Sequence, residues 1–207
     1  MAVLSWRPDD LEVPPYTADW LRQRLADGGA LTPVTESGAA VARLTPAAVL
    51  MPVVARDNGL TLLLTQRTDH LHDHPGQVAF PGGRRDDTDA SPLATALREA
   101  EEEIGLDPAQ VEVIGVLPEY RTGTGFSVTP VVGLVSLPLS LRLDEFEVAQ
   151  VFEAPLDFLL DPANHKRQSI HVRGALREYY AMPYDGHFIW GATAGMIVSL
   201  YRHLHSL

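Results

Sequence analysis

Hydrophobic and polar positions along the chain follow two periods, which separate predicted strands from predicted helices. Nearly continuous apolar runs at 47–54 and 60–65 predict two buried strands. Asp57, Asn58 and Gly59 lie between these runs and form a favourable turn sequence. The two strands are therefore predicted to pair as a hairpin.

Apolar residues recur at helical spacing after Ser91, which is a good N-cap residue. Pro92 suits the first helical position, and Gly105 can take the left-handed conformation that ends a helix. We therefore predict a helix from about Pro92 to Gly105, with a buried stripe formed by Leu93, Ala96, Leu97, Ala100 and Ile104.

The other periodic segments alternate between strands and helices. Loops are expected at 28–38 and 66–81, a short amphipathic helix at 19–25, strands near 111–117, 128–135, 169–172 and 178–183, a strand-like start at 147 with a short helix at 156–160, and a terminal helix at 193–203. This order predicts an α/β fold in which helices pack on the faces of a mixed sheet.

Composition narrows the class of protein. The 207 residues, 45% hydrophobic and 21% charged, suit one globular domain. A formal charge of −11 argues against nonspecific binding to nucleic acid or to an anionic membrane.

The absence of cysteine excludes disulfides, thiolate metal sites and cysteine nucleophiles, so we expect a reducing compartment, the cytoplasm. Segment 1–30 lacks a continuous apolar core, and the apolar run at 128–141 is too short to span a membrane.

Glu99, Glu102 and Glu103 gather on one arc of the predicted helix, apart from its buried stripe. Carboxylates three and four residues apart repel one another by roughly 0.2 to 0.5 kcal/mol per pair. Mg²⁺ or Mn²⁺ reverses this repulsion, because hard divalent cations prefer oxygen ligands. An acidic run can also be a solvated face, but the preceding loop Phe80–Gly83 favours a metal site for diphosphate chemistry.

The loop Phe80–Gly83 and the segment Arg98–Leu106 together resemble the Nudix box, the signature of hydrolases that cleave a nucleoside diphosphate linked to another group. The helical half matches fully. The loop half departs from the general pattern, and the nearest acid is Asp89. It is similar instead to the bacterial coenzyme A pyrophosphatases, in which the same four residues lead into an Asp-rich loop.

The resemblance to that subgroup extends on both sides of the box. Upstream, Leu63–Thr65, Arg67 and Gly76 stand at the corresponding spacing, while Thr68 and His72 replace the usual Ser and Arg. Because histidine is mostly neutral at pH 7, His72 weakens the expected phosphate contact. Downstream, the segments 147–156 and 189–194 also resemble these enzymes.

The resemblance implies a Nudix-type α/β/α sandwich at 45–207, with 1–44 as an N-terminal extension packed on the domain. It also implies metal-dependent hydrolysis of coenzyme A to 3',5'-ADP and 4'-phosphopantetheine. Glu99, Glu102 and Glu103 would hold Mg²⁺ or Mn²⁺, and Glu147 is the first candidate for the general base. Substrate would contact Arg67, Gly76, Gly82 and Gly83.

Other residues have simpler interpretations. Arg98 lies off the carboxylate arc and is expected to form an ion pair that orients Glu102. His70, His72 and His74 alternate, but no zinc spacing follows them. The stretch 189–191 could stack a base or the pantetheine arm, but aromatic residues beside branched ones are more often core, so Trp190 is not counted among the site residues.

Two alternatives remain open at this stage. The same chemistry suits ADP-ribose, NADH or a nucleoside triphosphate, because the acidic helix recognises only the diphosphate and the metal ion. A noncatalytic nucleotide-binding module on the same fold is the second alternative, since fold does not fix function.

Overall fold

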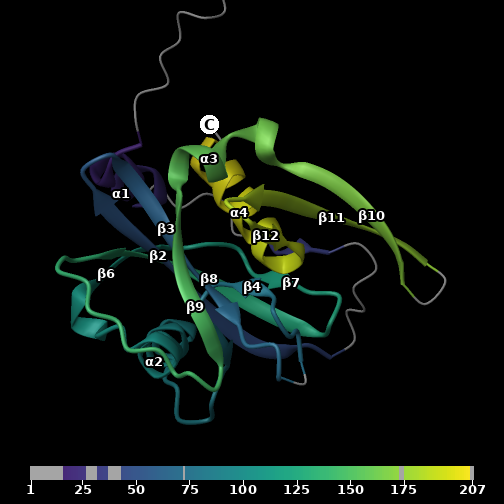
Figure 1. The fold of residues 1–207 in the computed structure, drawn as a ribbon, viewed down its shortest axis with the longest axis horizontal. Coiled ribbons are helices and arrows are strands. Elements are labelled where there is room, and N and C mark those ends of the chain that lie inside the picture. The colour runs from purple at the N-terminus through teal and green to yellow at the C-terminus, as the bar shows by residue number, and fades with distance from the viewer. Residues whose placement is uncertain (1–15, 27–31, 37–42, 72, 173–174, 206–207) are drawn as a thin grey trace, which may run out of the picture.

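The computed structural model describes residues 16–26, 32–36, 43–71, 73–172 and 175–205. Its main sheet contains nine strands and is mixed (Figure 1). The strands of this sheet are β1 (Val34–Thr35), β2 (Thr45–Arg56), β3 (Gly59–Arg67), β4 (Val78–Ala79), β5 (Gly82–Arg84), β6 (Val111–Val116), β7 (Tyr120–Arg121), β8 (Phe126–Val135) and β9 (Val148–Pro155).

The centre of the sheet combines parallel and antiparallel pairs. β2 runs parallel to β8 and antiparallel to β3, and β3 pairs with β9 in antiparallel register. The predicted hairpin is thus confirmed, with Arg56 opposite Gly59 at its turn. β5, a strand that the sequence pattern does not predict, adds Gly82–Arg84 to β2 and brings the glycine loop onto the sheet.

Helices cover both faces of the main sheet, as predicted (Figure 1). α2 (Pro92–Ile104) buries Ala96, Ala100 and Ile104 against one face, together with Leu50 of β2 and Leu63 of β3. The opposite face packs against a larger apolar core that includes residues of α1 (Ala18–Ala26), α3 (Leu156–Leu160) and α4 (Gly191–His205). Short 3-10 turns at Pro108–Gln110 and Pro162–Asn164 complete the described helices.

A second, three-stranded antiparallel sheet stands beside the main one. It contains β10 (Lys166–Val172), β11 (Ala175–Tyr184) and β12 (His187–Trp190). The sequence predicts the first two strands within a single sheet, and the structure corrects this. The α3 helix and the turn after it lead the chain out of the main sheet before β10 begins, and β11 and β12 then pack against α4.

The segment before β2 contacts the rest of the fold where the structure describes it. Leu21 and Leu25 of α1 are buried in the larger core, and β1 pairs with β7 in parallel register. Division of the chain at residue 45 stays a prediction. Within the described ranges, the helices lack the length and apolar character needed to cross a membrane.

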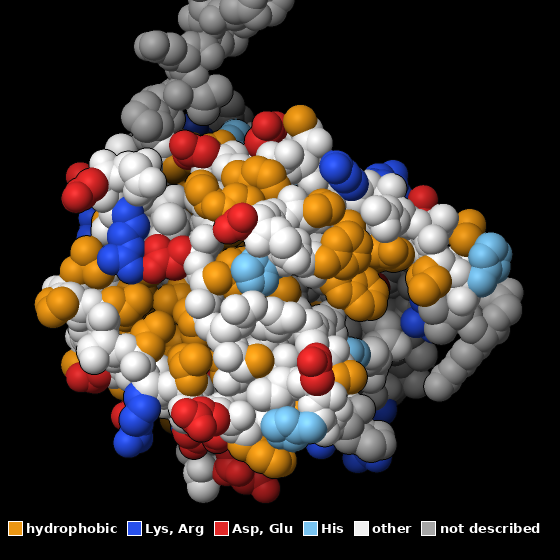
Figure 2. Space-filling view, viewed as in Figure 1, with side chains coloured by type: hydrophobic (Ala, Val, Ile, Leu, Met, Phe, Trp, Pro, Cys, Tyr) orange, Lys and Arg blue, Asp and Glu red, His pale blue; other side chains and the backbone are white. Residues whose placement is uncertain are grey.

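Charged side chains are dispersed over the face of the molecule that Figure 2 shows. On the face that Figure 2 shows, lysine and arginine side chains stand apart from one another and form no broad basic surface. This distribution agrees with the net charge of −11, and the exclusion of nucleic acid as a partner stays a prediction.

Candidate active site

α2 begins and ends where the sequence predicts. The Ser91 side chain accepts a hydrogen bond from the N–H of Ala94 at 3.2 Å, and Gly105 ends the helix with a φ of 67°. Packing of the apolar stripe on β2 and β8 then fixes the rotation of the helix. The acidic arc consequently lies beside the glycine loop in β5.

Glu103 is the most buried of the three predicted metal ligands, with a side chain that is 7% exposed. The N–H of Gly82 donates to its Oε2 at 3.2 Å, and Arg67 Nη1 lies 3.9 Å from its Oε1. Burial raises the pKa of Glu103 to about 8, because these two contacts compensate the buried charge only in part. A cation at this position would supply the missing compensation.

Glu99 lies against the backbone of the glycine loop. A Cβ atom on Gly83 would stand 2.6 Å from the carboxylate carbon and from both oxygens of Glu99, so only glycine allows this approach. Burial raises the pKa of Glu99, opposed by the guanidinium of Arg98. Gly82 is equally constrained, since its Cβ would lie 2.5 Å from the carbonyl oxygen of Ala48.

Glu147 joins the acidic group from a distant part of the sequence. It lies in the turn before β9, and its carbonyl accepts a hydrogen bond from the N–H of Thr68 at 3.0 Å. The negative charge of Glu147 contributes to the raised pKa of both Glu99 and Glu103. The charge of Glu147 therefore acts on both acids, and its part as the base of a shared site stays a prediction.

Arg98 connects the acidic arc to the loop that precedes α2. Its Nη1 lies 2.8 Å from Glu102 Oε2, which agrees with the predicted ion pair. Its Nη2 also lies 2.9 Å from Glu99 Oε1, so Arg98 orients two acids rather than one. Asp89 holds the guanidinium from the other side, at 3.1 Å from Nε and 3.0 Å from Nη2.

Asp89, the loop acid nearest to the expected position, is committed to structural contacts. It accepts hydrogen bonds from the Thr95 hydroxyl and from the N–H of Asp86, each at 2.9 Å. The Arg98 guanidinium holds the pKa of Asp89 well below its ordinary range. Asp89 thus positions Arg98, a role that its spacing in the sequence does not reveal.

The donors suit Mg²⁺ or Mn²⁺ in chemistry, because all are carboxylates and one of them is buried with incomplete compensation. Among the described residues, no three acidic or histidine side chains already converge in a metal-binding arrangement. Arg98 holds Glu99 and Glu102 instead. The His70 ring packs at a tilt against Phe146, with ring centroids 4.8 Å apart, and His72 lies outside the described residues.

A cavity of about 820 Å³ opens beside the glycine loop. Of the residues predicted to bind substrate, Arg67, Gly82 and Gly83 line it. Gly76 is not in the lining; with a φ of 67° and its carbonyl bonded to Gln66 Nε2 at 3.2 Å, it shapes the preceding loop. Its contact with substrate stays a prediction.

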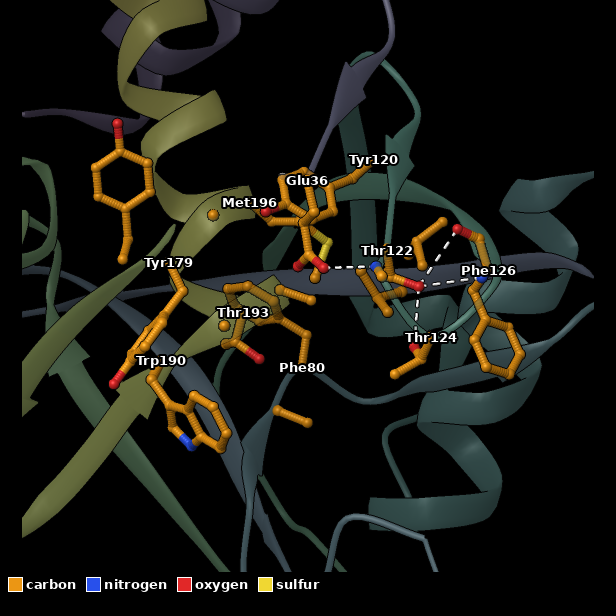
Figure 3. Close-up of a pocket in the computed structure, with 18 of the residues that line it drawn as sticks. Glu36, Phe80, Tyr120, Thr122, Thr124, Phe126, Tyr179, Trp190, Thr193 and Met196 are labelled. Carbon is orange, nitrogen blue, oxygen red and sulfur yellow. Dashed lines mark hydrogen bonds between the residues drawn. The ribbon is translucent and has the colours of Figure 1, made fainter. Parts of the chain in front are cut away.

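The second sheet supplies the far wall of the cavity, which sequence reasoning missed. Figure 3 shows Tyr179 and Trp190 on one side and Thr122 and Phe126 on the other. The Tyr179 and Trp190 rings meet edge to face, with centroids 5.5 Å apart. Trp190 is therefore a lining residue and not only a core residue, contrary to the expectation from its branched neighbours.

The chain matches the family model of the NUDIX domain over residues 44–169. This match covers more than half of the chain and includes the glycine loop, α2 and Glu147. The chain belongs to the Nudix family. Nudix hydrolases act on diphosphate bonds and generally use divalent metal ions. The family match ends within β10, before the wall that carries Tyr179 and Trp190.

A curated relative agrees with this assignment. The chain is 51% identical over 154 residues to a protein of Escherichia coli (strain K12) named "Uncharacterized Nudix hydrolase NudL". The aligned residues cover 74% of this chain and 80% of that protein. A Nudix hydrolase from M. smegmatis, RenU, is 25% identical with a TM-score of 0.46, over 62% of this chain and 81% of that one. The NUDIX domain of Shewanella oneidensis NrtR, complexed with ADP ribose, is 23% identical with a TM-score of 0.44, over 58% and 78% of the two chains.

Proposed function

We propose that this Nudix hydrolase cleaves the diphosphate bond of coenzyme A to give 3',5'-ADP and 4'-phosphopantetheine. The observation that carries the proposal is that Gly82 and Gly83, which lie against Glu103 and Glu99, line a large cavity. The cavity volume of about 820 Å³ suits a ligand of this size. The sequence resemblance to bacterial coenzyme A pyrophosphatases adds support for the substrate.

The charge of the cavity wall also supports an anionic substrate. The whole chain carries 27 acidic and 16 basic residues. The lining reverses this balance, with five arginines against three carboxylates: Arg67, Arg84, Arg167, Arg177 and Arg202 against Glu36, Asp73 and Glu178. A basic lining in an acidic protein favours a negatively charged small molecule over a cationic or neutral one.

Each residue of the site has a defined part in the proposed reaction. Glu99, Glu102 and Glu103 would hold Mg²⁺ or Mn²⁺, which when bound withdraws charge from the diphosphate and lowers the pKa of a bound water. Arg67 would bind diphosphate oxygens through charge-assisted hydrogen bonds. Glu147 would accept the proton of the attacking water, and Arg98 keeps Glu99 and Glu102 in place for these steps.

Other nucleoside diphosphate derivatives form the second candidate class, because the Tyr179 and Trp190 corner can receive any base. ADP-ribose, NADH and a nucleoside triphosphate belong to this class. The noncatalytic alternative is less well supported, since all three acids of the arc are present and Glu147 stands with them.

Product analysis tests the proposal. The purified protein is incubated separately with coenzyme A, ADP-ribose, NADH and ATP, in Mg²⁺, in Mn²⁺ and with chelator. We expect metal-dependent release of 3',5'-ADP from coenzyme A, faster than cleavage of the other three compounds. Faster turnover of another compound would reassign the substrate, and no turnover of any would support a binding module.

A further inference from the structure

Arg177 of β11 lines the cavity, and its guanidinium is not fully hydrogen-bonded within the described residues. Its Nε is covered from solvent and has no hydrogen-bond partner among the described residues. Two other described side chains share this property, at Arg121 Nε and His187 Nδ1, but neither residue lines the cavity. Buried donors in native proteins nearly always have partners, so an unpaired one beside a cavity needs an explanation.

The position of Arg177 is set by the second sheet and by a glycine across from it. A Cβ on Gly123 would lie 2.7 Å from Arg177 Nη1, so the guanidinium rests on the loop between β7 and β8. The carboxylate nearby is that of Glu36, which accepts hydrogen bonds from the N–H of Gly123 at 2.6 Å and from the Tyr120 side chain. Glu36 is thus already engaged by groups other than Arg177.

Arg177 shares one face of its sheet with the aromatic corner. Residues two apart on a strand point to the same face, which places Arg177 with Tyr179. Trp190 is directly opposite Ala181, the next residue of that face, and meets Tyr179 edge to face. A ring held against Tyr179 and Trp190 would therefore have a cationic fork beside it and the glycine loop on another wall.

We propose that Arg177 recognises a phosphate monoester carried by the nucleoside half of the substrate, separate from the diphosphate. The inference rests on the proposed function, in which Arg67 and the glycine loop serve the diphosphate. A phosphate monoester carries close to two negative charges and three acceptor oxygens at pH 7. Arginine matches this geometry with parallel hydrogen bonds, and a bound anion would add charge compensation at Arg177, whose Nε has no hydrogen-bond partner among the described residues.

Arg167 provides a matched control within the same cavity. It lines the cavity from β10, but its Nη2 is already paired with Glu178 Oε2 at 2.8 Å. Loss of Arg167 removes the same formal charge and a similar volume as loss of Arg177. An effect specific to Arg177 is therefore not an effect of net charge alone.

The first test is calorimetric binding of adenosine 3',5'-bisphosphate and AMP, which needs no turnover. The wild type is expected to prefer the bisphosphate by roughly ten-fold or more. Arg177→Gln should remove this preference while AMP binding changes less than two-fold, and Arg167→Gln should retain the preference. Equal binding of the two nucleotides by the wild type, or equal weakening of both in Arg177→Gln, would overturn the inference.

A kinetic test separates this inference from the proposed function. We expect kcat/KM for coenzyme A to exceed that for 3'-dephospho-coenzyme A, and Arg177→Gln to reduce only the former. Equal cleavage of both by the wild type would overturn the inference and leave the proposed function intact. A preference for the bisphosphate without cleavage of either coenzyme would support the inference and overturn the proposed function. Arg177→Lys, which keeps the charge, provides an intermediate preference should Arg177→Gln not fold.

Discussion

Glu103 is a residue whose position suits the binding of a metal ion and does not favour the stability of the metal-free fold. Its pKa is raised to about 8 by burial, so the protein without a cation holds an acid that is difficult to ionise. The Gly82 N–H and the distant Arg67 guanidinium stabilise the anion only in part. A divalent cation would favour the ionised form, which links metal binding to the charge of this side chain.

Replacement of Glu103 by Gln should lower kcat by at least about a hundred-fold, which effectively abolishes turnover, while the fold is preserved. The neutral amide keeps the volume of the side chain but cannot supply the charge that holds the cation. Glu101→Gln is the control, because Glu101 is an exposed acid on the same helix. Activity is measured by product release and metal affinity by calorimetry with Mn²⁺. Near-normal activity in Glu103→Gln would contradict the metal assignment.

Gly83 is the second residue at which a small change should have a large effect. In Gly83→Ala the new methyl group would lie 2.6 Å from the Glu99 carboxylate, so one of the two groups must move. We expect activity to fall about ten-fold or more while stability changes little, because the Glu99 carboxylate is the end of a flexible side chain and can move aside. Steady-state kinetics and urea unfolding measure the two effects. Wild-type kcat and KM in this variant would show that the close approach is not required.

At the scale of the element, α2 depends on its first turn for the position of the acids. The Ser91 cap fixes where the helix begins, and Asp89 just before it clamps Arg98. Arg98 in turn contacts Glu99 and Glu102. Asp89, a loop residue, thereby holds, through Arg98, carboxylates further along the helix.

Removal of the cap in Ser91→Ala should lower the free energy of unfolding by about 1 kcal/mol. Ser91→Asp is the matched control, because aspartate also caps helices and should retain the stability. Thermal and urea unfolding of the three proteins give the comparison. Activity of the folded Ser91→Ala protein should change little, since the side chain bonds only the Ala94 N–H. Equal stability of the Ala and Asp variants would show that the cap contributes nothing.

At the scale of the whole molecule, one ion pair connects three strands of the main sheet. Arg56 of β2 donates to Glu153 of β9, with Nε at 3.0 Å from Oε2, and the Thr61 hydroxyl of β3 donates to the same oxygen at 2.6 Å. The Arg56 guanidinium, assisted by Thr61, holds the pKa of Glu153 below its ordinary value of 4.5. A carboxylate with a lowered pKa stabilises the folded state when it is ionised.

The Glu153 contribution is expected to be complete above about pH 4.5 and to decline as the pH falls from there toward the lowered folded-state pKa. The sign follows because the unfolded chain binds the proton more readily than the folded one. Urea unfolding between pH 3 and pH 6 should show a shallower decline in Glu153→Gln than in the wild type. If the free energy of unfolding falls equally with pH in the two proteins, Glu153 does not contribute to the acid sensitivity of the fold.

Much of the fold follows from local pattern. The hairpin of β2 and β3 and both ends of α2 are set by turn, capping and periodicity signals that lie within a few residues of each other. The short strands β4, β5, β7 and β12 carry too few residues to show a period. They form because neighbouring strands offer backbone partners, which no local signal reports.

The sequence by itself determined the mixed α/β fold, the acidic arc of α2 and its relation to the Nudix family, because these depend on spacing within short segments. Only the tertiary structure decided that the charge of Glu147 acts on Glu99 and Glu103, that Asp89 clamps Arg98, and that Trp190 faces a cavity. These juxtapositions join residues far apart in the chain or on different elements. They depend on how strands and helices pack, which hydrophobic periodicity does not specify.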